Sequence, residues 1–315
     1  MTTQARSSVG VIGLGIMGSA MAANLRRAGY RVMGYDVLAT RRREHRLAGG
    51  QIAPSCRAVA DGAGIVICSL PSVEALLATA AELAAARPRG GSRRSPRPAQ
   101  IVIETSTLPI TTKEQARRRL AAAGAMLLDC PLSGTGPQAR VRDLVVYASG
   151  DRAAYRRAAP VLDAVARAHY YIGAFGAGSK MKFVANLLVA IHNVAAAEAL
   201  VLAMKAGLDP EMVVKVIGDG AGSSRMFQVR GPMMAKGRYF PAMMKLEVWK
   251  KDMTIITDFA RDAGCPTPLF AASAPIYTAA GTMGGSDEDT AAVCRVLERM
   301  AGAARRSKVK GQRAK

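Results

Sequence analysis

The chain has 315 residues, half of them hydrophobic, so it is long enough for two domains with buried cores and is not a disordered chain. Its formal charge of +21 raises nucleic acid or another anionic partner as a possibility. Two basic segments, residues 88–98 and 304–315, carry much of that charge. Because neither interleaves aromatic residues for stacking on bases, we expect solvated charge and no nucleic-acid partner.

The cysteines and the apolar segments indicate the cellular compartment of the protein. Five cysteines are scattered without the paired spacing of a zinc site or a redox dithiol, so we expect reduced thiols, no metal and a cytoplasmic protein. The first residues lack the separate apolar stretch and cleavage site of a secretory signal. The most apolar long segment, residues 183–204, contains Asn186, Asn193 and Glu198, which is too polar for a membrane span. We therefore interpret it as a buried helix and expect no membrane association.

The first half alternates short apolar runs with helical patterns, which predicts a parallel sheet wrapped by helices. The expected strands cover residues 9–12, 31–35, 65–68, 101–103, 125–128, 144–148 and 170–172. Several are continuous apolar runs, as expected for strands covered on both faces. The first helix places Met17, Met21 and Leu25 on one stripe and ends at Gly29, where a positive φ is usual. Residues 88–98 interrupt this half as a mobile basic insertion.

After residue 175 only helical periodicity remains. The sequence Gly176-Ala177-Gly178 predicts a hinge, followed by a long helix that ends near Ala206. Further helices are expected over residues 210–217, 250–263, 269–280 and 287–300. We therefore predict an α/β Rossmann-type doubly wound sheet over residues 7–175, then an all-α C-terminal domain over residues 176–303 built around a long interdomain helix, and a disordered basic tail over residues 304–315.

A glycine pattern follows the first expected strand and opens an amphipathic helix, which is the context of a dinucleotide-binding loop. Gly13 permits the tight turn, Gly15 lets a pyrophosphate approach the backbone, and Gly18 lets the helix pack closely on the strand. The free amides and positive dipole end of the helix then face the phosphates. Cofactor binding is assigned to the whole loop: Gly13, Leu14, Gly15, Ile16, Met17 and Gly18.

The end of the second expected strand indicates which dinucleotide is bound. A carboxylate at Asp36 accepts hydrogen bonds from ribose hydroxyls and repels a 2′-phosphate. Arg41, Arg42 and Arg43 follow it and could turn toward such a phosphate. The sequence therefore favours NAD as the cofactor, with NADP as the alternative.

Successive motifs, in one order along residues 9–300, carry a family resemblance. They are residues 11–25, Leu70-Pro71-Ser72, Thr105-Ser106-Thr107, residues 129–135, residues 176–186 and Lys251-Asp252. With these the chain resembles the β-hydroxyacid dehydrogenases, the group of 3-hydroxyisobutyrate and 6-phosphogluconate dehydrogenases. The resemblance implies an NAD(P)-dependent oxidoreductase that moves a hydride between the nicotinamide and the 3-hydroxyl carbon of a short-chain 3-hydroxy acid. It also implies a homodimer or homotetramer.

Oxidation of an alcohol by this route needs a base that takes the hydroxyl proton, and the reverse reaction needs the same group as an acid. The resemblance implies that Lys182 is this general acid/base. Asn186 lies four residues on, shares a helix face with Lys182, and is expected to contact the same substrate hydroxyl. Desolvation beneath the nicotinamide would lower the pKa of the lysine and make it usable near neutral pH. Lys180 is expected on the surface.

The resemblance implies the remaining contacts as well. A substrate carboxylate is expected on the amides and hydroxyls of Ser133, Gly134 and Thr135. Other residues implied to contact the cofactor or substrate are Leu70, Pro71, Thr107 and Lys251. Lys251 would add a cation near the carboxylate or the ring. Residues 136–143 depart from the glycine-rich stretch of the family, which puts the shape of the pocket in doubt but not the reaction class.

The substrate class stays open among 3-hydroxyisobutyrate-, glycerate/tartronate- and threonate-like acids, although residues 222–227 and 247–252 look most like the L-threonate branch. One alternative function is a non-catalytic dinucleotide-binding protein that docks on nucleic acid or another anionic partner through its basic segments. Relatives of that kind have lost the lysine, whereas Lys182 is present here. Another alternative, imine reduction by the same fold, belongs to a branch that replaces the lysine.

Overall fold

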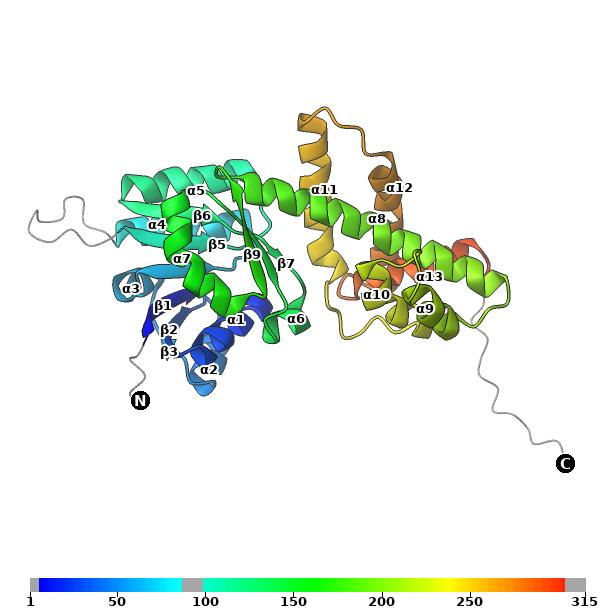
Figure 1. Cartoon of the computed structure of the whole chain (residues 1–315), viewed down its shortest axis with the longest axis horizontal. Coiled ribbons are helices and arrows are strands. Elements are labelled where there is room, and N and C mark those ends of the chain that lie inside the picture. The colour runs from blue at the N-terminus through cyan, green and yellow to red at the C-terminus, as the bar shows by residue number, and fades with distance from the viewer. Residues whose placement is uncertain (1–5, 87–98, 304–315) are drawn as a thin grey trace, which may run out of the picture. The chain divides into compact units, whose positions relative to one another are not determined.

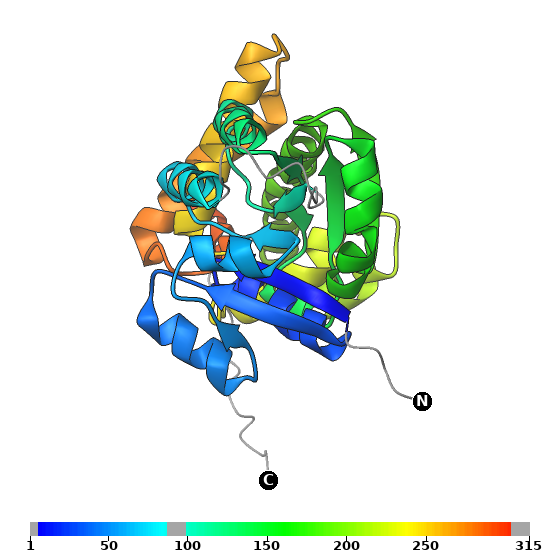
Figure 2. The same cartoon turned by 90° about the vertical axis from the view of Figure 1, so that its left-hand side faces the viewer.

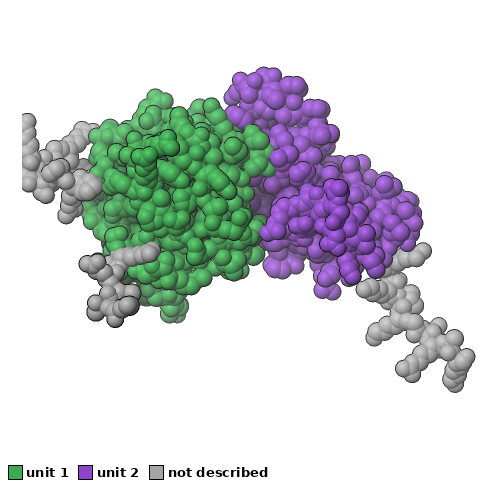
Figure 3. Space-filling view, in the orientation of Figure 1, with its two compact units in different colours: residues 1–185 green, residues 186–315 purple. Residues whose placement is uncertain are grey.

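The structure is a computed structural model that describes residues 6–86 and 99–303. The basic insertion expected over residues 88–98 and the tail over residues 304–315 lie outside these described residues. The chain divides into two compact units, residues 1–185 and 186–315 (Figure 3), and each is described by itself. The division falls inside helix α8, Ala177–Lys205, later than the boundary expected near residue 175, because the first turn of α8 is hydrogen-bonded to the sheet.

One nine-stranded sheet forms the centre of the first unit, counted over its described residues. Its strands are β1 Arg6–Ile12, β2 Tyr30–Tyr35, β3 Gln51–Ile52, β4 Ile65–Cys68, β5 Gln100–Glu104, β6 Ala125–Asp129, β7 Leu132–Ser133, β8 Val145–Ser149 and β9 Ala168–Gly173. Their order is β3-β2-β1-β4-β5-β6-β8-β7, with β9 paired to β8. Figures 1 and 2 show the sheet from two directions. Strands β1 to β6 pair in parallel, and the order reverses between β1 and β4. Doubly wound sheets bind ligands at this switch point.

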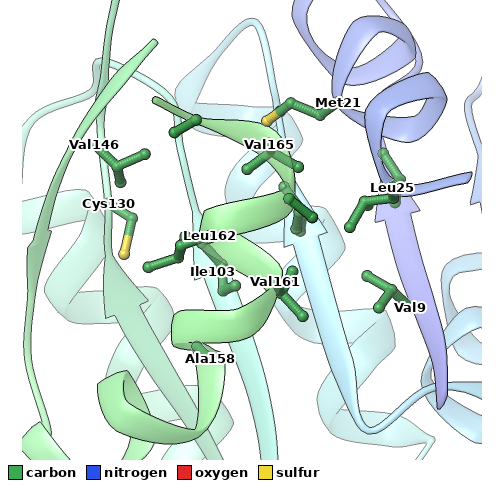
Figure 4. Close-up of a cluster of buried hydrophobic side chains, with 14 of the residues drawn as sticks. Val9, Met21, Leu25, Ile103, Cys130, Val146, Ala158, Val161, Leu162 and Val165 are labelled. Carbon is green, nitrogen blue, oxygen red and sulfur yellow. The ribbon is translucent and has the colours of Figure 1, made fainter. Parts of the chain in front are cut away.

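Helices cover both faces of the sheet because successive strand residues point to opposite faces. One core lies under α1 (Ile16–Arg27), α6 (Gly136–Arg140) and α7 (Arg152–Val165), and the other under α3 (Cys56–Gly62), α4 (Val73–Ala85) and α5 (Ile110–Ala122). In Figure 4, Val161 and Leu162 of α7 and Leu25 of α1 lie over Val9 and Ile103 of the sheet. The predicted Rossmann-type fold is confirmed.

A histidine on helix α2, Ala39–Leu47, lies enclosed between two glycines. His45 is 4% exposed. A Cβ added to Gly34 would lie 2.7 Å from its imidazole ring, and one added to Gly50 would lie 2.1 Å from its Nε2. Burial lowers the pKa of His45, and the charge of Arg26 lowers it further. Both effects favour the neutral form of the ring.

The second unit consists of helices. After α8 come α9 Pro210–Gly218, α10 Arg225–Lys236, α11 Leu246–Asp262, α12 Pro268–Gly284, the 3₁₀ turn η1 Thr290–Ala292 and α13 Val293–Met300. The predicted all-α character of this half is confirmed. Helix α10 was not among the expected helices, because Gly231 and Pro232 lie within it and interrupt its periodicity.

Helix α8 is the longest element, and its first residues differ from the expectation of a hinge. Ala177 and Gly178 form its first turn, and a Cβ on Gly178 would lie 2.2 Å from the carbonyl oxygen of Tyr147, so only glycine allows this close approach. Among the described residues, α8 alone is long and apolar enough to cross a membrane, with a mean hydropathy of 1.9, but 44% of that apolar window is buried inside the protein. Buried Ala197 and Leu200 support its interpretation as a core helix.

Candidate active site

Loops that follow five neighbouring strands meet at the carboxyl edge of the first unit's sheet. Backbone hydrogen bonds join each loop to the next: Gly13 N to Tyr35 O at 2.9 Å, Ser69 N to Ile12 O at 2.9 Å, Thr105 N to Cys68 O at 3.0 Å, and Cys130 N to Glu104 O at 2.8 Å. The predicted contact residues at positions 13–18, 36, 70–71 and 107 follow these strands, and those at positions 133–135 lie at the end of β7. Parallel order thus gathers motifs that are far apart in sequence.

The three glycines of the first loop have different surroundings. Gly13 has a φ of +85°, and a Cβ there would lie 2.1 Å from the carbonyl oxygen of Ser69. A Cβ on Gly18 would lie 1.8 Å from the carbonyl oxygen of Gly13. The protein itself therefore requires both glycines. Gly15, the N-cap of α1, has no atom within 4 Å of an added Cβ, which leaves open space for a pyrophosphate at the helix N-terminus.

Asp36 connects the glycine loop to the end of β2. Its Oδ2 accepts the N–H of Leu14 at 2.7 Å, and its Oδ1 accepts the N–H of Leu38 at 2.8 Å. Arg42 donates to the carbonyl oxygen of Asp36 at 2.6 Å, and Arg41 reaches the carbonyl oxygen of Leu14 at 3.4 Å. The carboxylate and the two guanidinium groups therefore lie together beside the loop.

The loops after β4 and β5 are tied to each other. The N–H of Leu70 donates to Ser106 Oγ at 2.8 Å, and Thr105 Oγ1 donates to the carbonyl oxygen of Cys68 at 2.7 Å. Pro71 is exposed and Thr107 is half-buried. The residues predicted to contact the nicotinamide thus lie on two loops that hold each other in place.

The predicted substrate loop divides into two parts. Ser133 ends β7, and Gly134 has a φ of +137° that favours glycine. Thr135 is the N-cap of α6, and both its N–H and its hydroxyl donate to Gln138 Oε1, at 3.0 and 3.1 Å. These two donors of Thr135 are therefore committed to the helix cap, which leaves Ser133 and Gly134 as the stronger candidates for a carboxylate. The capping-box spacing Thr-x-x-Gln was the sequence signal for this arrangement.

Helix α6, which follows the predicted substrate loop, is anchored to α1, the helix that follows the glycine loop. Asn24 is buried, and its Nδ2 donates to the carbonyl oxygen of Ala139 at 2.7 Å. Arg27 donates to Asn24 Oδ1 at 2.6 Å and to the carbonyl oxygen of Arg140 at 2.8 Å. The helices that follow the glycine loop and the predicted substrate loop, α1 and α6, are therefore joined by hydrogen bonds.

The two lysines at the start of α8 differ in exposure. Lys182 is 9% exposed, whereas Lys180 is exposed on the helix surface. Asn186, 3% exposed, follows Lys182 by one helical turn. Of the two lysines, Lys182 is therefore the one shielded from solvent and Lys180 the solvated one.

In the second unit, Asn186 belongs to a small buried network. Its Nδ2 donates to Asp252 Oδ2 at 3.0 Å, and Lys251 Nζ donates to Asp252 Oδ1 at 2.9 Å. Asp252 thus holds two of the predicted site residues. Sequence reasoning included Asp252 in a motif but gave it no role, because its partner Asn186 lies 66 residues away.

The described ranges, residues 6–86 and 99–303, contain no group of three or more His, Cys, Asp or Glu side chains placed to hold a metal ion. All five cysteines are free, and Cys265 is exposed whereas the other four are buried. Burial raises the pKa of the Cys130 thiol, which keeps it protonated beside the substrate loop.

Comparison with known proteins agrees with this geometry. The NAD-binding domain of 6-phosphogluconate dehydrogenase matches residues 8–173, and the NAD-binding domain of NADP-dependent 3-hydroxyisobutyrate dehydrogenase matches residues 176–297. An L-threonate dehydrogenase of Cupriavidus necator is 35% identical over 92% of this chain and 96% of its own length. A glyoxylate/succinic semialdehyde reductase of Arabidopsis thaliana is 30% identical over 92% of this chain and 79% of its own length. The solved structure of a 3-hydroxyisobutyrate dehydrogenase from Salmonella typhimurium superposes with a TM-score of 0.80 at 29% identity, covering 92% and 100% of the two chains.

The sheet and the glycine loop, together with these relatives, identify an NAD(P)-dependent oxidoreductase. More specifically, the chain belongs to the β-hydroxyacid dehydrogenase family. The predicted family and enzyme class are thereby confirmed, and the enzymatic function is favoured over a non-catalytic dinucleotide-binding protein.

Proposed function

We propose that this protein oxidises a short-chain 3-hydroxy acid with NAD, that Lys182 is the general acid/base, and that L-threonate is the first candidate substrate. The burial of Lys182 on α8, next to exposed Lys180, is the observation that carries the proposal. The similarity to L-threonate dehydrogenase over nearly the whole chain supports the choice of substrate.

The proposed chemistry divides between the cofactor and the protein. The bound dinucleotide supplies the hydride acceptor. Lys182 takes the proton of the 3-hydroxyl group as its carbon becomes a carbonyl, and returns that proton in the reverse reaction. Asn186 donates one Nδ2 hydrogen to Asp252, so its second Nδ2 hydrogen can donate to the oxygen of the substrate hydroxyl group, whose own proton goes to Lys182. Asp252 thereby orients the amide.

Binding of the substrate carboxylate is assigned to the end of β7 and the residues that follow it. The hydroxyl of Ser133 and the amide of Gly134 are donors suited to an anion, since Thr135 already donates to Gln138. Lys251 adds positive charge for the substrate or the nicotinamide, although its pairing with Asp252 neutralises part of that charge.

We propose NAD in preference to NADP because Asp36 would repel a 2′-phosphate. The guanidinium groups of Arg41 and Arg42 donate to backbone carbonyl groups beside Asp36, which reduces their availability to a phosphate. Replacement Asp36→Ser should raise kcat/KM with NADP relative to NAD. An unchanged ratio would remove Asp36 as the selecting residue.

We also propose a cytoplasmic homodimer or homotetramer. Exposed apolar side chains on α8 and α9, among them Leu188, Leu202, Met212 and Val216, support self-association. Sizing chromatography with light scattering measures the mass directly, and a monomer at working concentration would contradict the proposal.

Reduced-cofactor formation tests the activity. The purified protein is assayed with NAD or NADP against 3-hydroxyisobutyrate, D-glycerate, tartronate, L-threonate and D-threonate, and we expect the highest kcat/KM with L-threonate and NAD. Lys182→Ala should lower kcat by about 10²- to 10⁴-fold and leave NADH affinity nearly unchanged. Lys180→Ala, an exposed lysine on the same helix, is the matched control and should retain activity. Turnover by Lys182→Ala at the wild-type rate would sink the assignment.

A further inference from the structure

A lysine outside the predicted site is buried at the carboxyl edge of the sheet. Lys113 lies on α5, its side chain is fully buried, and its ammonium group has three partners. The Nζ atom is 2.6 Å from Glu104 Oε2, 2.8 Å from Asp129 Oδ1, and 2.7 Å from the carbonyl oxygen of Ser106. The contacts with Ser106 and Asp129 are hydrogen bonds, and the contact with Glu104 Oε2 is a buried ion pair.

On one side, the network holds the loop after β5. Glu104 Oε1 accepts the N–H of Ser106 at 2.8 Å, while Lys113 donates to the carbonyl oxygen of the same residue at 2.7 Å. The hydroxyl of Ser106 accepts the N–H of Leu70. Both backbone polar groups of Ser106 are thus held by buried charges, and Thr107 is the next residue along the chain.

On the other side, the network holds the start of α8. Asp129 Oδ2 accepts the N–H of Ser179 at 2.8 Å, and Asp129 Oδ1 accepts the hydroxyl of Ser179 at 2.8 Å. Ser149 Oγ accepts the N–H of Gly178 at 2.9 Å and donates to Asp129 at 3.2 Å. A carboxylate is favourable at a helix N-terminus. Lys182 lies one turn further along this anchored helix.

Stability alone gives no reason for such a network. Buried ion pairs lose their hydration, and well-packed apolar residues often serve stability as well or better. Lys113 also lies in the first part of α5, where the helix dipole disfavours a cation. Burial would lower the pKa of Lys113, but Asp129 and Glu104 raise it above its ordinary value, so the lysine stays charged.

We propose that Lys113 is a positioning residue for the proposed reaction. Through Glu104 and Asp129 it joins the loop of Thr107 to the first turn of α8, and so sets where Lys182 stands relative to the nicotinamide side of the site. The inference rests on the proposed roles of Thr107 and Lys182. A small misplacement of reacting groups lowers the rate by orders of magnitude, so the link between the Thr107 loop and α8 should affect turnover.

The kinetic test compares variants of one helix in the full-length protein. Lys113→Met removes the ammonium group and leaves two buried carboxylates, so kcat should fall by about 10- to 100-fold while KM for NAD changes little. Leu120→Ala removes a buried side chain of the same helix outside the network, so it should lower the stability of the protein and keep the wild-type kcat. Arg118→Met replaces an exposed cation of α5 and should change neither stability nor kcat. Equal loss of kcat in Leu120→Ala and Lys113→Met would overturn the positioning role.

Amide hydrogen exchange supplies a readout that does not depend on turnover. In Lys113→Met the amides of Ser106, Gly178 and Ser179 should exchange at least about 10-fold faster than the loss of global stability explains. In Leu120→Ala all core amides should accelerate together. Unchanged protection of Ser106 and Ser179 in Lys113→Met would refute the link between the Thr107 loop and α8. If the wild-type protein oxidised none of the tested acids, only the proposed function would be refuted, and the exchange experiment would still test the link.

A milder variant covers the case in which Lys113→Met does not fold. Ser179→Ala removes one hydroxyl donor of Asp129 and keeps the backbone donor. We expect a several-fold lower kcat with an unchanged KM for NAD, together with faster exchange at Gly178. Wild-type kcat and wild-type exchange in this variant would count against the proposal.

Discussion

Replacing Gly15 should mainly weaken cofactor binding, whereas replacing Gly18 should mainly destabilise the fold. A Cβ on Gly15 meets nothing within 4 Å, whereas a Cβ on Gly18 would lie 1.8 Å from the carbonyl oxygen of Gly13 and 2.9 Å from its carbonyl carbon. Gly15→Ala should therefore lower the free energy of unfolding by only about 1 kcal/mol, the preference of an N-cap position for glycine over alanine. Gly18→Ala forces the loop or the helix to move and should cost about 3 kcal/mol.

The affinity for the dinucleotide, in contrast to stability, should depend on Gly15. The methyl group of Gly15→Ala enters the open space at the N-terminus of α1, where the pyrophosphate is expected. Losing one charge-assisted hydrogen bond to a phosphate costs about 1.5–3 kcal/mol, which raises Kd about 10- to 150-fold. Urea unfolding without cofactor measures the first quantity, and fluorescence titration with NADH measures the second. The reasoning is refuted if Gly15→Ala binds NADH as the wild type does, or if it is as unstable as Gly18→Ala.

Three further predictions follow from buried polar groups. Burial lowers the pKa of His45 below its ordinary 6.5, so the unfolded chain binds more protons than the folded protein near that pH. The free energy of unfolding should therefore decrease as the pH falls through 6.5, and it should decrease less in His45→Gln. Urea unfolding at several pH values measures both. Asn24→Ala leaves the carbonyl oxygen of Ala139 without this donor and should lower the free energy of unfolding by about 1–3 kcal/mol, measured by urea unfolding. Asp252→Ala releases the amide of Asn186 and should lower kcat by about 10-fold or more in steady-state assays; an unchanged kcat would exclude an orienting role.

Sequence reasoning located the features that depend on local pattern. Apolar runs such as residues 65–68 and 101–103 became central strands. Gly13 has the positive φ of a tight turn, and Gly18 lies at a close approach, as predicted. The family motifs placed the predicted contact residues at the ends of strands, because parallel order brings those ends to one edge. Helix α10 was not predicted because Gly231 and Pro232 break its period, although in the structure it packs against α9 and η1.

Features that depend on pairing across the fold were not predictable in the same way. Glu104 and Asp129 end two apolar strands, and Lys113 lies in an otherwise polar helix, so each alone has the pattern of a solvated charge. Their contacts emerge only when β5, β6 and α5 pack together. The commitment of Thr135 to Gln138 likewise depends on which conformation the loop adopts, since the same hydroxyl could have bound a substrate.

The enclosure of His45 has a consequence for how this sequence can change. With its ring within 2.7 Å of a Cβ at Gly34 and within 2.1 Å of one at Gly50, neither glycine can gain a side chain while the imidazole remains. A smaller residue at position 45 would release both constraints at once. Among relatives, we expect positions 34, 45 and 50 to covary, with a large residue at 45 found only where 34 and 50 are glycine. An alignment would then identify the contact between α2 and the sheet edge without any structure.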